Sequence, residues 1–174
     1  MIQSKYWSID RLPEITRSQL KLLQDNQIND TKILLKLAYN LESRTTLANQ
    51  LQLNQKYINK WAALADLARL PSVGNCYCGL LLHSGIVSVT QLAQTPFYRL
   101  HRQIIRLQVA TLQRKDLSPP VELVKKWVEE AMRPPKGFSS CFKSSKALAA
   151  TDPPNALLHR VVRRRKTATS ATKY

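Results

Sequence analysis

Three arginines in the second half of the chain are spaced so that together they could bind an anionic group. Arg99, Arg102 and Arg106 lie three and four positions apart, so they share one face if this stretch is helical. No acidic residue occurs between Asp66 and Asp116, whereas six Lys or Arg do. Guanidinium groups bind phosphate oxygens, so the row predicts contact with a polyanion, against the simpler alternative of a solvated basic face. The basic residues that close the stretch are Arg114 and Lys115.

A second basic cluster lies near the end of the chain. It comprises Arg163, Arg164, Arg165 and Lys166. A flexible cluster of this kind binds phosphates by releasing counterions, without choosing a sequence. Contact with anionic lipid headgroups and a purely solubilising tail are the alternatives, and no lipidation motif accompanies the cluster.

A turn at residues 70–75 reads Leu-Pro-Ser-Val-Gly-Asn. In turns of this type, glycine lets the backbone approach a phosphate, and N–H groups at the start of the next helix bond its oxygens. Gly74 and Asn75 are therefore the residues of a predicted phosphate clamp. Ser72 stands where a first glycine is usual, and no Lys or Arg follows, so a purely structural turn is the alternative.

Catalytic and metal-binding patterns do not emerge from the sequence. Cys76 and Cys78 lack the second ligand pair that structural zinc sites need, and we expect them on different sides of a helix. His83 has no carboxylate nearby in sequence, and Glu129 with Glu130 fits a surface pair. No nucleophile motif or glycine-rich phosphate loop occurs. We therefore expect no enzyme, no cofactor and no metal site.

Two stretches of the chain share one pattern of apolar residues. Residues 9–38 and 67–96 match with a shift of 58 positions, and the apolar skeleton is kept while the polar residues differ. The matched pairs are Leu12 with Leu70, Leu23 with Leu81, Ile28 with Ile86, and Leu34 with Leu92. Such a repeat predicts two copies of one packing unit, and the second copy has a helix-hairpin-helix pattern.

Helix signals cover most of the chain up to residue 133. Only four glycines occur and strand-type alternation is scarce, so the predicted class is all-α. We expect a short helix to begin at Thr45, and Thr95-Pro96 to open a long helix that ends near Arg114. Expected N-caps of other helices are Thr16, Asp30, Asn54 and Ser88.

The helices near residues 46–61 also match a loose helix-turn-helix spacing. In that interpretation Lys56, Asn59 and Lys60 lie on the outer side of the second helix and enter a major groove. Two amphipathic helices around a short turn give the same spacing by chance, so packing is the alternative.

The composition of the chain indicates which classes of partner it could bind and where it is located. The chain has 27 Lys and Arg against 11 Asp and Glu, a net charge of +16, which favours nucleic acid, an anionic membrane face or an acidic protein as partner. The start lacks the apolar region of a signal peptide, no apolar run is long enough to span a bilayer, and three cysteines suit a reducing compartment, so we expect a cytoplasmic protein.

The predicted parts are a first helix-hairpin-helix unit (1–42), a linking helical pair (43–69), a second unit (70–116), a last helix (117–133) and a disordered basic tail (134–174).

Residues 4–115 resemble an uncharacterised family of helix-hairpin-helix proteins with a SAM-like fold, and the whole chain is similar to cyanobacterial members. The stretches that carry the resemblance are Trp61 to Gly74 and Leu80 to Ala93. The resemblance implies two tandem helix-hairpin-helix units joined by a helical pair, and it implies no reaction. The chain departs from the pattern at Glu14, Thr16 and Ser72, where a phosphate clamp would need glycine.

These observations predict a non-enzymatic protein that associates with DNA or RNA, mainly through backbone phosphate and with low sequence selectivity. The alternative is a protein-interaction adaptor whose basic surface docks on an acidic partner complex. The acid-free basic stretch favours nucleic acid, whereas the missing turn glycines favour the adaptor.

Overall fold

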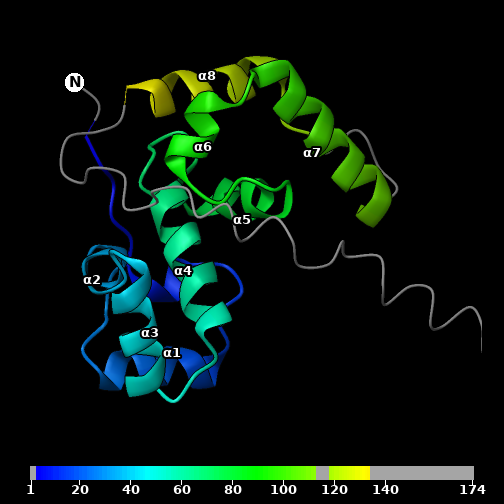
Figure 1. Cartoon of the computed structure of the whole chain (residues 1–174). Coiled ribbons are helices and arrows are strands. Elements are labelled where there is room, and N and C mark those ends of the chain that lie inside the picture. Colours follow the sequence, from blue (N-terminus) through cyan, green and yellow to red (C-terminus); the bar gives the residue numbers. More distant parts are fainter. Residues whose placement is uncertain (1–2, 113–117, 134–174) are drawn as a thin grey trace, which may run out of the picture. The chain divides into compact units, whose positions relative to one another are not determined.

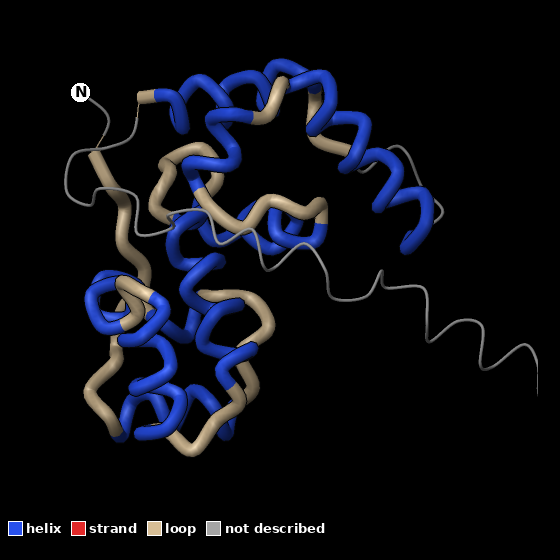
Figure 2. Tube along the Cα trace, viewed as in Figure 1, coloured by secondary structure: helices blue, strands red, loops and turns tan. Residues whose placement is uncertain are grey.

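The computed structural model describes residues 3–112 and 118–133, which all belong to one unit of the chain, Met1–Phe142. Over these residues the regular elements are helices, which confirms the predicted all-α class (Figures 1 and 2). The elements are η1 (Ile9–Arg11), α1 (Arg17–Asp25), α2 (Thr31–Leu37), α3 (Leu41–Gln50), α4 (Gln55–Ala68), α5 (Gly74–His83), α6 (Val89–Gln94), α7 (Phe97–Leu112) and α8 (Val121–Met132). The predicted tail, residues 134–174, lies outside the described residues, and the predicted part boundaries stay predictions.

Side chains cap the starts of α1, α2, α3, α4 and α6. Four predicted starts are confirmed, because a side chain at each accepts a backbone N–H from the first helical turn. These caps are Thr16, Asp30, Asn54 and Ser88. Asn40 caps α3 in the same way, so this helix begins at Leu41 and the predicted start at Thr45 is wrong.

The two sequence copies end their first long helix with the same backbone geometry. The amide of Ile28 donates to the carbonyl of Leu23 at 2.9 Å, and 58 positions later Ile86 donates to Leu81 at 3.0 Å. The residue before each isoleucine is left-handed, with φ of 61° in the first copy and 90° at Gly85 in the second. All four apolar side chains are buried, so the repeated skeleton is a repeated core.

Helix α4 lies at the centre of the core (Figure 1). It packs against α2, α3 and α5, and every residue from Trp61 to Leu70 is buried. Alanines at positions 62, 63, 65 and 68 allow neighbouring helices to approach closely, while Trp61 and Leu64 fill the space between them. This helix links the two copies through one hydrophobic core.

The N-terminal segment and α8 both contact the connection between α4 and α5. The indole N–H of Trp7 donates to the carbonyl of Ala68 at 2.9 Å, and the amide of Lys5 donates to Arg69 at 3.0 Å. Helix α8 packs against α6 and α7, and its buried Trp127 stacks at a tilt on Tyr77 with ring centres 4.9 Å apart. The connection is therefore an internal part of the fold.

Candidate functional site

Helix α7 presents the arginine row to solvent. Arg99, Arg102 and Arg106 are all exposed, and at about 100° per residue they leave the helix within an arc of about 60°. Leu100 and Ile104, on the opposite side, are fully buried. No acidic residue occurs in α7. The helix therefore carries one continuous basic face.

The entry turn of α7 and the packing of its apolar side fix the direction of this helix. The chain enters the helix through Thr95 and Pro96, and the carbonyl of Pro96 accepts the amides of Arg99 at 3.0 Å and Leu100 at 3.1 Å. The apolar side of α7 packs against α8 and α5. The arginines consequently project from a rigid element, although each side chain keeps its own rotamer freedom.

A cavity of about 250 Å³ lies beside the first turns of α7. The connection between α5 and α6 supplies Gly85 to its wall, α6 supplies Gln91, and α7 supplies Arg99 and Gln103. Oε1 of Gln103 is buried and has no hydrogen-bond partner within the described ranges. A buried acceptor without a partner costs about 1–3 kcal/mol, so rotation of this amide toward a donor in the cavity would be favourable.

The second turn, which holds the predicted clamp, is engaged inside the protein. Gly74 is buried with φ of 54°, and its amide donates to Leu70 at 2.8 Å. The Nδ2 group of Asn75 donates to the carbonyl of Arg11 at 3.4 Å. Trp7 covers the glycine closely, since a Cβ atom there would lie 3.3 Å from its ring. This geometry favours the structural interpretation of the turn.

Glu130 was expected at the surface, and this expectation is wrong. Its carboxylate is half-buried and accepts the amide of Ser72 at 3.1 Å. The neighbouring Glu129 is exposed and pairs with Lys125 along the helix at 3.9 Å. One of the two glutamates therefore holds the second turn, while the other lies on the surface.

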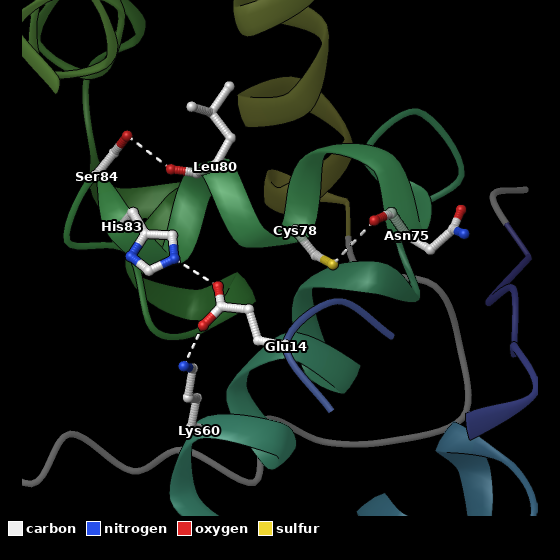
Figure 3. A network of polar contacts seen from close by, with 7 residues as sticks. All are labelled: Glu14, Lys60, Asn75, Cys78, Leu80, His83 and Ser84. Carbon is white, nitrogen blue, oxygen red and sulfur yellow. Dashed lines mark hydrogen bonds and ion pairs between the residues drawn. The ribbon is translucent and has the colours of Figure 1, made fainter. Parts of the chain in front are cut away.

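The first turn places a carboxylate between two basic side chains (Figure 3). Glu14, at φ of 66°, forms an ion pair with Lys60 of α4 and a hydrogen bond with Nε2 of His83 of α5. Partial burial acts to raise the pKa of Glu14, but hydrogen bonds from Lys60 and His83 and their charges outweigh it and lower the pKa below its ordinary 4.5. An ionised carboxylate here repels a phosphate, so this turn is unsuited to a clamp.

A buried ion pair joins α4 to the start of α6. Nε of Arg69 lies 3.0 Å from Oδ1 of Asp66, and Oδ2 accepts the amide of Val89 at 2.9 Å. Burial raises the pKa of Asp66, while Arg69 and the Val89 amide act against this rise. The pair is structural, since both side chains are nearly inaccessible.

The cysteines face different sides of α5, as predicted. Cys76 is exposed, whereas Cys78 is buried and its thiol donates to the carbonyl of Asn75 at 3.5 Å (Figure 3). Burial raises the pKa of Cys78 to about 11, so this thiol is protonated and unreactive at neutral pH. In the described part of the chain, no cluster of three or more His, Cys, Asp or Glu side chains could hold a metal ion.

The helix-turn-helix interpretation of α3 and α4 has little support from this arrangement. Lys60, expected on the outer side, pairs with Glu14. Lys56 is exposed, but α4 is buried from Trp61 onward. Only its first turns could reach a groove, so packing is the better interpretation.

Several predicted basic residues lie outside the described residues. They are Arg114, Lys115, Arg163, Arg164, Arg165 and Lys166. Among the helices that the structure describes, none is long and apolar enough to cross a membrane. The sequence reasoning also missed Tyr98, whose side chain is 63% exposed beside the arginine row. Its position one turn before Arg102 was a signal that could have found it.

Comparison with known proteins identifies a family. No curated protein and no solved structure matches the chain. One family model, described as a domain of unknown function (DUF4332), matches residues 13–133. The match covers most of the first sequence copy, the whole second copy, α7 and α8, and more than two thirds of the 174 residues. The chain therefore belongs to the DUF4332 family.

Proposed function

We propose that this protein is a non-enzymatic nucleic-acid-associated protein that binds backbone phosphate with low sequence selectivity. The observation that carries the proposal is the basic face of α7, where three exposed arginines lie within about 60° on a helix without acidic residues. The outer two are seven residues apart, about 10 Å along the axis, which suits neighbouring phosphates of one strand. Arg114, Lys115 and the basic cluster 163–166 add positive charge to the chain.

The proposal rests on α7 and not on the turns. We propose that the two copies are tandem helix-hairpin-helix units with a SAM-like fold. We also propose that the protein is a cyanobacterial-type member of its family and that it is cytoplasmic. In this chain the turn amides that could meet a phosphate are used internally at Ser72 and Gly74, and Glu14 adds a negative charge. The units would then serve as the scaffold that presents α7.

The second candidate function is an adaptor that docks its basic surface on an acidic protein complex. The observation that favours it is the internal use of both turns, because groups that are engaged inside the protein cannot at the same time bind a phosphate. The same arginine face would then pair with carboxylates. Capture of partners with and without nuclease treatment separates the two functions, since an adaptor keeps its partner when nucleic acid is destroyed.

The salt dependence of binding tests the main proposal. Replacing Arg99, Arg102 and Arg106 together by Gln should flatten the slope of log K against log[salt] by about two to three units, because each phosphate contact contributes about 0.7–0.9. A control variant replaces three exposed lysines of other helices by Gln and removes the same charge. These lysines are Lys21, Lys36 and Lys56.

The two variants distinguish binding by the arginine face of α7 from attraction by the net charge of the protein. A large effect of the arginine variant with a small effect of the lysine variant supports the α7 face. Equal effects mean that net charge alone attracts the polyanion. Unchanged binding by the arginine variant, with binding lost when residues 163–166 are changed to Gln, would contradict the role of α7 and favour the adaptor.

A further inference from the structure

We infer that the basic face of α7 takes single-stranded nucleic acid, with one unpaired base stacked on the ring of Tyr98. The inference rests on the proposed function and adds the class of ligand. Proteins that bind single strands without sequence preference combine cations along the backbone with aromatic side chains on which bases stack. Both parts meet on α7.

Tyr98 offers an anchored stacking surface. Its side chain is 63% exposed, although aromatic rings usually bury their apolar area. The ring of Phe97 meets it edge to face, with centres 5.9 Å apart and planes at 84°, and Phe97 itself packs against the core. A base stacked on Tyr98 would therefore meet a ring that is held from behind.

The position of Tyr98 on the helix suits one continuous strand. At about 100° per residue, its side chain leaves α7 about 40° from that of Arg102 and one turn before it. The arginine row then continues along the helix to Arg106. A base on Tyr98 would thus have its own backbone directed toward the guanidinium groups.

The other flank of the row also suits an unpaired base. The cavity beside Arg99 and Gln103 is about 250 Å³, just under the range of about 300–1,000 Å³ that is usual for drug-sized ligands. It can hold one ring system, and the unpaired Oε1 of Gln103 offers an acceptor after rotation of its amide. In a duplex the bases are paired and stacked on each other, and extracting one costs free energy. Both flanks therefore favour a single strand.

Fluorescence anisotropy with the full chain tests the inference. The probes are a labelled pyrimidine strand of about twelve nucleotides, made as DNA and as RNA, and the duplex of the same DNA. The wild type should bind the single strands more tightly than the duplex. Tyr98→Ala should weaken single-strand binding by about 5- to 150-fold, the range measured when a stacking aromatic is removed, and leave duplex binding unchanged. Tyr98→Phe should keep the preference, since it keeps the ring.

A matched control is Tyr39→Ala, because Tyr39 is 52% exposed and lies between α2 and α3. It should bind all probes like the wild type, and circular dichroism melting should show that both alanine variants fold. Equal binding of strand and duplex by the wild type, or an unchanged single-strand affinity in Tyr98→Ala, overturns the inference while the proposed function stands. Absence of binding to every probe overturns the proposed function itself.

Discussion

The indole N–H of Trp127 donates a hydrogen bond to the carbonyl oxygen of Ser72 at 3.1 Å, although 55 residues separate them. One turn later on α8, Glu130 accepts the amide of the same serine. A single helix thus satisfies both backbone groups of one turn residue. The position that a glycine usually occupies in a phosphate-binding turn is here held from within the protein.

Glu130→Gln should destabilise the fold, because the amide of Ser72 would lose a charged acceptor. The amide oxygen of Gln still accepts a weaker hydrogen bond, so the expected loss is about 1–1.5 kcal/mol in the free energy of unfolding, measured by urea denaturation. Glu129→Gln is the control, and its exposed pair with Lys125 should contribute less than about 1 kcal/mol. Equal losses in the two variants would mean that the contact with Ser72 does not stabilise the turn.

Gly74→Val should destabilise the fold more than Thr16→Val, the matched position of the first copy. Gly74 has φ of 54°, which strains a branched residue by about 1–3 kcal/mol, and a Cβ atom would press on Trp7. Thr16→Val removes only an N-cap, for about 1 kcal/mol.

The variant Gly85→Val distinguishes backbone strain from steric crowding as the cause of the loss in stability. Gly85 has φ of 90°, but a Cβ atom there would meet nothing within 4 Å. Its variant should fall between the other two in melting temperature. A Gly74→Val protein that melts like the wild type would show that this turn needs neither the glycine nor the space.

The repeated fold could be predicted because its signals are local. Caps, apolar spacing and the residue before each isoleucine all lie within a few positions of the helices that they define. The start of α3 was mispredicted because Arg44 interrupts its apolar pattern. This arginine is only 5% exposed, and its Nε–H donates to the carbonyl of Ala38 at 2.9 Å, so a polar residue occupies a core position.

The polar contacts between distant segments could not be predicted. Glu14 and His83 are 69 residues apart, and Ser72 and Glu130 are 58 apart. Nothing in the local sequence indicates such a pair, because it depends on how the helices pack. The arginine face of α7 could be predicted, since a helical spacing alone places three residues on one side.

Asp66→Ala should cause a large loss of stability. It would leave the buried guanidinium of Arg69 without this carboxylate and the amide of Val89 without its acceptor. Removing one partner of a buried pair costs about 3–5 kcal/mol, which urea denaturation would detect as a much lower midpoint. Asp25→Ala, at an exposed position of α1, is the control and should change stability by less than about 0.5 kcal/mol. A small effect at Asp66 would show that the ion pair contributes little to joining α4 and α6.

The pairs of Glu14 with Lys60 and His83 should make stability depend on pH in the acid range. Because the pKa of Glu14 is lowered on folding, its contribution is complete above its ordinary pKa of 4.5 and is lost as the pH falls through the lower value of the folded state. Glu14→Gln should therefore melt below the wild type at pH 7, and this difference should shrink as the pH is lowered past 4.5. Glu42→Gln, at an exposed position in the first turn of α3, is the control and should show a small difference. A Glu14→Gln difference that stays constant from pH 7 to pH 3 would mean that the carboxylate acts through its shape and not through its charge.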